Sequence, residues 1–305
     1  MLMNAPDFDA AAAFIAANAR VVDRRRFGRL FADDDAQPVR DAVAAYRNED
    51  GGFGHALEPD CRAPGSQPLA VEMALRIMDE TGAWDDALVR GACDWLSAVA
   101  PAEGGAAGAE PSLLGWPHAP WWVPEEGHPA SVISTGLIAG TLNSRGVSHP
   151  WLDRATELMW TRIDALARSG GAELQGGPGG EYEMLGVLAF LQHVPDRDRA
   201  RAREVFGRVG PLIIEREMVA LEPGAPGEVH YPLDFAPEPD SLARELFDEA
   251  TIKAHLDHLA QAQRDDGGWT FNWLAWSPAA EREWRGFLTV DALRLLRANG
   301  YLAYP

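Results

Sequence analysis

Asp266-Gly267-Gly268-Trp269 closes a stretch of this chain that occurs twice. The same pattern stands near the other end as Asp50-Gly51-Gly52-Phe53. Each copy follows a segment with helical periodicity, and the two glycines permit the positive φ with which a helix can end. The aromatic residue that follows can pack back between neighbouring helices. A pattern that recurs near both ends of a chain predicts a fold built by repetition.

Glycine-rich loops punctuate the chain between helical segments. Five such loops lie at Gly51-Gly52, Gly104-Gly105, Gly176-Gly177, 224–227 and Gly267-Gly268. Their separations are on the order of 40 to 70 residues, which is the scale of a two-helix repeat.

Helices that are apolar on most sides alternate with helices that have one polar face. Residues 68–79, 130–142 and 183–193 are nearly all apolar, whereas residues 150–167 are two-faced. Inner helices of a two-layered fold touch neighbours on every side, and outer helices face water, so two concentric layers require this alternation. We predict an all-α fold, an (α/α)6 barrel (toroid) of about six inner and outer helix pairs. An irregular all-α domain is the alternative.

Helix ends and domain limits follow from the same patterns. The first helical segment is predicted over residues 7–30 and the last over 286–296. No shift in composition divides the chain, so we predict one domain, 1–305.

Composition excludes several classes of function. The chain has 305 residues, 47% of them hydrophobic, and a formal net charge of −19, which disfavours nucleic acid and anionic membranes as partners. Two cysteines are too few for a disulfide framework, and we find neither a signal peptide nor an apolar run of about 20 residues. We expect a cytoplasmic protein that acts on a small molecule. The oligomeric state is left open.

Polar and aromatic residues concentrate in the predicted connecting loops. In an α/α barrel the loops from outer to inner helices emerge at one end, so these residues would surround one mouth. A first loop at 55–62 and another at 228–235 combine carboxylates with histidine, which is typical of acid–base chemistry. The candidate catalytic residues are His55, Glu58, Asp60, His230 and Asp234.

Aromatic and basic residues supply the candidate substrate-binding set. These residues are Arg62, Trp122, Tyr231, Trp273, Trp276 and Arg285. Aromatic faces can hold an isoprenoid chain, stack on a sugar ring or stabilise a cation. Structural roles are the alternative: Glu58 and Arg62 as an ion pair, Asp60 as a cap, and Trp269 as a staple between helices.

Metal and cofactor sites are not predicted. Carboxylates and histidines of the two loops could hold a divalent ion, but no tight ligand spacing supports one. The glycines follow no strand, so they form no phosphate-binding or dinucleotide-binding loop. Cys61 lies in the first loop without an obvious partner base.

The stretch 261–269, Gln-Ala-Gln-Arg-Asp-Asp-Gly-Gly-Trp, resembles the Q-and-W repeat of squalene–hopene cyclases and related prenyltransferase β-subunits. Residues 46–53 are similar to a second copy in which Phe53 replaces tryptophan. The resemblance implies the double-layered α/α toroid of the terpenoid cyclase and protein prenyltransferase superfamily.

The family's catalytic motifs are missing from this chain. Asp33-Asp34-Asp35 is followed by Ala36, so the D-x-D-D motif of the cyclases is absent, and Asp60-Cys61 lacks the spacing of the prenyltransferase zinc ligands. The zinc cysteines of lanthionine cyclases are absent too. The resemblance therefore implies a fold, and no catalytic residue is carried over.

Three hypotheses about function remain open. The first is an enzyme that acts on a hydrophobic small molecule such as an isoprenoid, through the carboxylates and histidines above. The second is a carbohydrate-active enzyme, since α/α barrels also host glycoside hydrolases, epimerases and lyases. The third is a non-catalytic binding module that grips a peptide or partner, which is favoured if the loop carboxylates point to solvent and have ordinary pKa values.

Overall fold

The computed structural model describes residues 6–174 and 180–302, which form helices joined by loops. Within those two ranges the β-structure consists of three isolated bridges, so the predicted all-α class is confirmed. The Gly176-Gly177 loop lies outside the described residues. None of the described helices is both long and apolar enough to cross a membrane.

The described residues divide into two compact units. Unit 1 comprises residues 6–42 and 219–302, and unit 2 comprises residues 43–174 and 180–218. The toroid and the single domain over 1–305 stay predictions.

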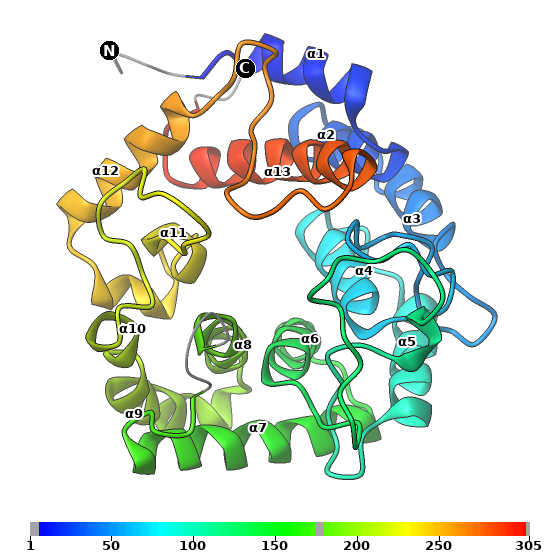
Figure 1. The fold of residues 1–305 in the computed structure, drawn as a ribbon, viewed down its shortest axis with the longest axis vertical. Coiled ribbons are helices and arrows are strands. Elements are labelled where there is room, and N and C mark those ends of the chain that lie inside the picture. The colour runs from blue at the N-terminus through cyan, green and yellow to red at the C-terminus, as the bar shows by residue number, and fades with distance from the viewer. Residues whose placement is uncertain (1–5, 175–179, 303–305) are drawn as a thin grey trace. The chain divides into compact units, whose positions relative to one another are not determined.

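Unit 2 contains two rows of helices. They are α4 (Pro68–Glu80), α5 (Asp86–Val99), α6 (Val132–Ser144), α7 (Pro150–Ser169), α8 (Gly180–Gln192), α9 (Arg199–Val209) and α10 (Leu212–Glu215), with the short 3-10 turns η1 (Pro111–Leu113) and η2 (Asp196–Asp198). Helix α6 packs between α4 and α8, and α7 packs between α5 and α9 and against α6 (Figure 1). The alternation of apolar and two-faced helices therefore corresponds to two layers within this unit.

Small residues let α6 and α8 approach closely. A Cβ atom added at Gly136 would lie 2.1 Å from the carbonyl oxygen of Gly186, and one at Gly140 would lie 2.5 Å from that of Ala189. Side chains larger than hydrogen would separate the two helices. Helix α7, by contrast, buries Leu152, Met159 and Ile163 along one face only.

Unit 1 is organised around its last helix. Its elements are α1 (Phe8–Asn18), α2 (Val21–Phe31), α11 (Pro232–Phe235), α12 (Glu249–Gln261) and α13 (Pro278–Ala298), with η3 (Leu242–Leu246), while α3 (Gln37–Ala44) spans the boundary with unit 2. Helix α13 packs against α1, α2 and α12, and α11 packs against α12. The fully buried Arg26 of α2 pairs with Asp291 of α13 and lies 4.2 Å from the ring centre of Phe287.

Two predicted helix boundaries in unit 1 are wrong. The segment 7–30 is two helices, because Ala19 and Arg20 are extended (ψ 155° and 159°) although neither glycine nor proline stands there. The last helix begins at Pro278 instead of 286, because the Ser277 hydroxyl accepts the N–H of Ala280 and Pro278 suits the first turn.

The two glycine cassettes, residues 48–53 and 264–269, form the same loop. In the first, the Asn48 N–H donates to Gly52 O (2.9 Å), and the Gly52 N–H donates to Asp50 Oδ1 (2.9 Å). In the second, the Arg264 N–H donates to Gly268 O (2.9 Å), and the Gly268 N–H donates to Asp266 Oδ1 (3.1 Å). The two stretches are thus alike in backbone structure as well as in sequence.

Both cassettes pack closely against the backbone of a neighbouring helix. Gly51 and Gly267 have φ of +94° and +88°. A Cβ at Gly51 would lie 2.5 Å from the Gly91 oxygen in α5, and one at Gly267 would lie 2.2 Å from the Ala10 oxygen in α1. Glycine is required in each unit by conformation and by space.

The aromatic residue of the second cassette has the predicted structural role. Trp269 is 2% exposed, and its indole N–H donates to Leu259 O (2.8 Å) in α12. Its backbone N–H donates to Thr289 Oγ1 (3.0 Å) in α13. Trp269 therefore staples two helices, and this prediction is confirmed.

Candidate functional site

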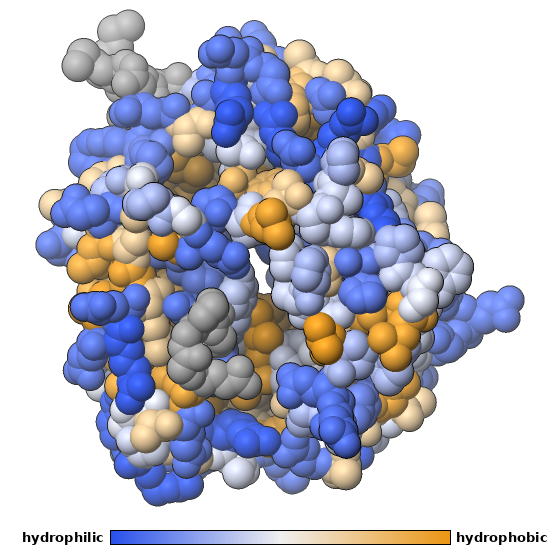
Figure 2. All heavy atoms as spheres, in the orientation of Figure 1, coloured by the Kyte–Doolittle hydropathy of each residue, from blue (hydrophilic) through white to orange (hydrophobic). Residues whose placement is uncertain are grey.

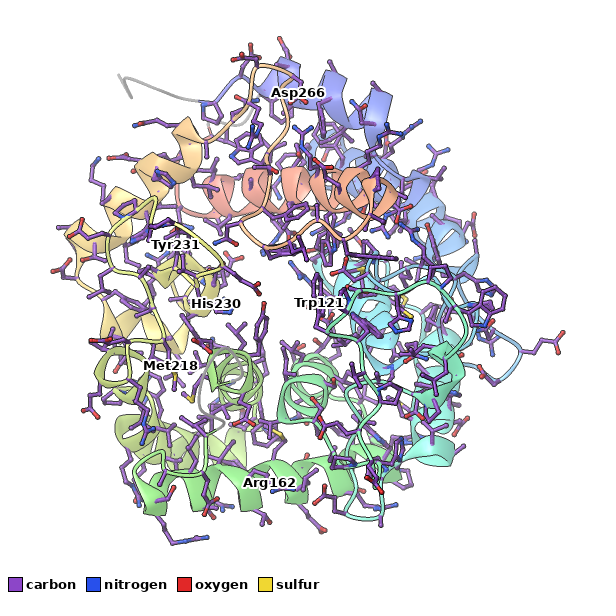
Figure 3. All side chains as sticks on the ribbon, in the orientation of Figure 1. Trp121, Arg162, Met218, His230, Tyr231 and Asp266 are labelled. Atoms are coloured by element: carbon purple, nitrogen blue, oxygen red, sulfur yellow. The ribbon has the colours of Figure 1, made fainter. Side chains whose placement is uncertain are left out.

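Two of the predicted site loops meet within unit 1. The side-chain amide of Asn272 donates to Val229 O at 2.9 Å, which joins the tryptophan-rich loop before α13 to the loop before α11. The latter is also held by the Ala220 N–H, which donates to His230 O at 2.8 Å. His230 and Tyr231 are therefore presented by a fixed segment (Figure 3).

Asp234 occupies the third position of α11 and closes its first turn. Its Oδ2 accepts the Tyr231 N–H at 2.7 Å and lies 3.8 Å from His230 Nδ1. Loss of hydration raises the pKa of the Asp234 carboxyl, and the Tyr231 N–H and the nearby His230 and His255 only partly offset that rise. The side chain is still 48% exposed, so the carboxyl is accessible to solvent and to small molecules.

His255 of α12 packs against this loop. It is 3% exposed, and its Nε2 lies 2.9 Å from Leu221 O, which requires the Nε2–H tautomer. Burial lowers the pKa of His255, so the ring stays neutral and packs 5.2 Å from the Tyr231 ring. The Tyr231 hydroxyl donates to Ala225 O (3.2 Å), and its pKa is raised by desolvation and by Asp234. Tyr231 is thereby positioned by two contacts.

Aromatic rings gather beside the same loops. Phe271 and Trp273 stack at 4.4 Å, Trp273 meets Trp284 edge to face at 5.5 Å, and Trp284 meets Phe287 at 5.7 Å. The Trp284 indole nitrogen is buried and has no hydrogen-bond partner among the described residues. Trp276, in the loop before α13, is half-buried.

Two residues of the last predicted loop belong to a helix. Trp284 and Arg285 stand within α13. Arg285 donates to Asp266 Oδ1 (2.8 Å) and to Trp269 O (3.2 Å), and its guanidinium lies 4.7 Å from the Phe14 ring. The hydrogen bond from Arg285 is the main cause of the lowered pKa of Asp266. These contacts tie Arg285 to the second cassette.

In unit 2 the first loop joins a different tryptophan-bearing segment. The Arg62 N–H donates to Pro117 O (2.9 Å), the Ala119 N–H donates to Asp60 O (2.8 Å), and Cys61 forms an isolated bridge with His118. His55 has a φ of +56°, and its Nε2 lies 2.8 Å from Asn48 Oδ1 of the first cassette.

Glu58, Asp60 and Trp122 are all buried. Glu58 Oε2 accepts the Asp60 N–H at 2.8 Å, so the carboxylate of Glu58 closes the turn. The space between Glu58, Cys61, Gln67 and Trp122 has no room for a water molecule. These side chains are therefore closely packed.

The cysteines of unit 2 are poor nucleophiles. Burial raises the pKa of Cys61 to about 11 and the pKa of Cys93 to about 12. Both are free thiols, and such thiols stay protonated near neutral pH.

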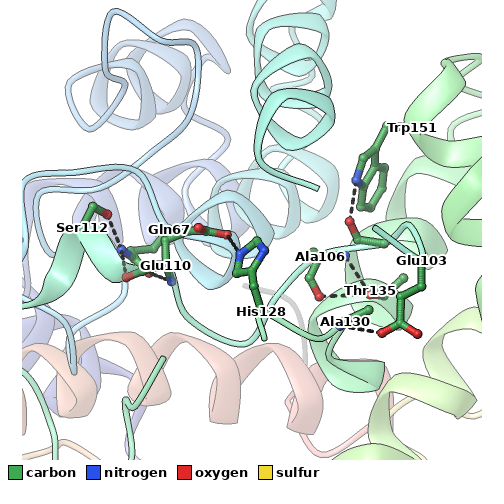
Figure 4. Close-up of polar contacts among 10 residues, drawn as sticks. Gln67, Glu103, Ala106, Glu110, Ser112, His128, Ala130, Thr135 and Trp151 are labelled. Atoms are coloured by element: carbon green, nitrogen blue, oxygen red, sulfur yellow. Dashed lines mark hydrogen bonds and ion pairs between the residues drawn. The ribbon is translucent and has the colours of Figure 1, made fainter. Parts of the chain in front are cut away.

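One polar network in unit 2 was missed by sequence reasoning. Glu110 Oε1 lies 2.9 Å from His128 Nε2. Gln67 accepts the Glu110 N–H (2.8 Å) and donates to Glu110 O (3.3 Å) and to Ser112 Oγ (2.8 Å), as Figure 4 shows. The partners are separated by 18 and 43 residues, so no local motif signals the network.

The predicted site residues are thus divided between the two units. His230, Tyr231, Asp234, Trp273, Trp276 and Arg285 lie in unit 1, and His55, Glu58, Asp60, Arg62 and Trp122 lie in unit 2. A single mouth for both sets stays a prediction. No group of three or more His, Cys, Asp or Glu side chains in the described ranges could hold a metal ion.

Comparison with known proteins adds no family to this description. The sequence matches no protein-family model, and no curated protein matches it.

Proposed function

We propose that this protein is an enzyme that protonates an uncharged, hydrophobic small molecule of the isoprenoid type in unit 1. The observation that carries the proposal is the Asn272–Val229 hydrogen bond, because it fixes an aromatic cluster beside an acid–base loop. The resemblance of the cassettes to Q-and-W repeats supports the isoprenoid class. The net charge of −19 disfavours anionic substrates such as diphosphates.

Asp234 would act as the general acid. Its raised pKa means that it keeps its proton at a higher pH than an ordinary aspartate, which a proton donor requires. The proton would pass from the carboxyl to a carbon of an alkene, and the resulting carbocation would lie against the faces of Phe271, Trp273 and Trp284. Loss of a proton from a carbon beside the cationic centre to water would form the alkene product. His230, with Nδ1 3.8 Å from Asp234 Oδ2, would relay that proton through water back to the carboxylate.

The raised pKa of Asp234 favours this proposal over a non-catalytic binding module, for which ordinary carboxylates suffice, whereas the 48% exposure of its side chain fits either. A structural carboxylate at a helix start is normally stabilised in its ionised form. Asp234 differs, because the loss of hydration outweighs the Tyr231 N–H and the nearby histidines.

Asp234→Asn tests the acid directly. Asparagine can still accept the Tyr231 N–H, so α11 should remain while the transferable proton is lost. The full chain would be incubated with squalene and with geranylgeraniol, and products followed by mass spectrometry. We expect product from the wild type and a loss of about 100-fold or more in the variant.

The matched control is Asp9→Asn, an exposed aspartate in the first turn of α1 in the same unit, which should keep wild-type turnover. Equal turnover by Asp234→Asn and the wild type, or no product from either isoprenoid with the wild type, would contradict the proposal.

A further inference from the structure

A closed loop in unit 2, residues 110–128, holds an imidazole–carboxylate pair at its base. Glu110 at its start bonds His128 at its end (2.9 Å). Just outside the loop, Ala107 forms an isolated bridge with Ala130, and the Ser131 N–H donates to Ala106 O (2.8 Å). These backbone contacts hold the two ends of the loop together, and with them Glu110 and His128.

The carboxylate is held rigidly while the imidazole reaches solvent. Gln67 is 1% exposed and pairs with both backbone groups of Glu110. The Glu110 side chain is 11% exposed, and the His128 side chain is 34% exposed. A buried acceptor that orients a half-exposed ring is the arrangement found where imidazole serves as a general base.

His128 has a left-handed backbone conformation. Its φ is +51°, a value that is uncommon outside glycine, although asparagine, aspartate and histidine adopt it more often than other residues. A conformation of this kind persists only where surrounding contacts enforce it, and it is frequent at functional sites. Here the Glu110 bond and the His128 N–H to Glu125 O bond (3.1 Å) enforce it.

The second ring nitrogen distinguishes His128 from the other imidazole–carboxylate pair of this unit. His149 lies 3.1 Å from Asp94, but its Nδ1 already accepts the Trp151 N–H (3.2 Å). Within the described ranges His128 Nδ1 makes no hydrogen bond, so with Nε2–H donated to Glu110 its lone pair is available.

We infer that Glu110 and His128 form a second catalytic site, in which His128 is a general base for the hydrolysis of uncharged carboxylic esters. The inference goes beyond the function proposed for unit 1 and rests on residues of unit 2 alone. Glu110, Glu125 and Glu126 disfavour an anionic substrate. The same loop exposes half of Trp116 and of Trp121, which suit a substrate with an apolar body. Trp121 is labelled in Figure 3.

The reaction needs only water as a second reactant. His128 Nδ1 takes a proton from water as the water oxygen bonds to the ester carbonyl carbon, and the carbonyl electrons move to their oxygen. Glu110 stabilises the imidazolium that forms. When the adduct collapses, the bond to the alcohol oxygen breaks, and the imidazolium returns the proton to that oxygen. The products are a carboxylic acid, an alcohol and neutral His128.

His128→Asn is the variant that tests this site, because asparagine tolerates a left-handed φ and should preserve the loop. The probe is p-nitrophenyl acetate with the full chain. We expect the wild type to hydrolyse it faster than buffer alone, and His128→Asn to lose about tenfold or more of that protein-dependent rate.

His149→Asn is the matched control, because it removes the other imidazole–carboxylate pair and leaves a good helix cap. It should keep the wild-type rate. A wild-type rate no greater than that of His128→Asn, or an equal loss in His149→Asn, would overturn the inference.

A spectroscopic measurement tests the positioning role of Glu110. In ¹⁵N NMR the His128 ring should be the Nε2–H tautomer in the wild type and a mixture of both tautomers in Glu110→Ala. Unchanged tautomer populations in that variant would overturn the role of Glu110.

Discussion

Asp234 and His255 lie close together in unit 1, yet loss of hydration moves their pKa values in opposite directions. In both residues loss of hydration disfavours the charged form, which is the carboxylate of Asp234 and the imidazolium of His255. The pKa of Asp234 is therefore raised and the pKa of His255 is lowered. Such divergence between neighbouring groups is typical of acid–base sites.

The lowered pKa of His255 predicts acid sensitivity. Between the folded pKa and the ordinary value of 6.5, the unfolded chain binds the proton more readily than the folded chain. The contribution of His255 to the free energy of unfolding therefore rises with pH through that window. On acidification this contribution is lost. In His255→Gln, which can still donate to Leu221 O, this loss should be absent.

Urea unfolding from about pH 7.5 to about pH 5 measures the effect. Asp234 contributes with the opposite sign, since its raised pKa lowers stability as the pH rises above 3.8, but it is present in both proteins. An equal loss of stability in wild type and His255→Gln would show that His255 is not the acid-sensitive group.

Sequence reasoning at the residue scale predicts features that are local. The role of Trp269 follows from its place after two glycines and is confirmed. The loop 228–235 was proposed as a site because His230, Tyr231 and Asp234 stand within five positions, and its chemistry stays a prediction. Glu110, His128 and Gln67 are brought together by folding alone. The positive φ of His128 is not readable from sequence either.

At the scale of elements, the two cassettes are a feature that repeats both in sequence and in structure. Each has the same two turn hydrogen bonds and packs on the backbone of a neighbouring helix, α5 or α1. Their aspartate and glycine positions have the same roles in both units, and the aromatic residue of each is buried, so the repeat could be read from sequence.

Alanine in place of Gly51 or Gly267 should destabilise its unit strongly. A left-handed φ costs a non-glycine residue about 1–2 kcal/mol, and a Cβ against a backbone oxygen adds about 1–3 kcal/mol. Gly82 and Gly300 have φ of +64° and +77° with open space around the missing Cβ, so Gly82→Ala and Gly300→Ala should show the conformational cost only.

Denaturant unfolding compares each cassette variant with its control in the same unit. If Gly51→Ala were no less stable than Gly82→Ala, and Gly267→Ala no less stable than Gly300→Ala, the close contact between each cassette glycine and the backbone of the neighbouring helix would be refuted.

Helix existence was easier to predict than helix ends. The apolar helices α4, α6 and α8 were recognised because burial on every side leaves no polar stripe. The break at Ala19 was missed since neither neighbour is a helix breaker. The early start of α13 was missed because tryptophans at 284 and nearby positions were taken for loop residues, although Ser277-Pro278 is a good helix start.

At the scale of the whole molecule, the net charge restricts the kinds of substrate more clearly than the fold does. Figure 2 shows hydrophilic residues over most of the face that it draws, and the net charge is −19. A strongly negative field repels anionic substrates and favours neutral or cationic ones. Both proposed sites satisfy this condition, because alkenes and simple esters are uncharged.

The central claim is that Asp234 is a proton donor, and a titration of its side chain tests this most directly. The measurement is a ¹³C NMR titration of aspartate-labelled protein, with the Asp234 signal assigned by its loss in Asp234→Asn. The account predicts a pKa clearly above the ordinary 3.8. A pKa at or below 3.8 would make Asp234 a structural cap of α11 and would contradict the proposed chemistry.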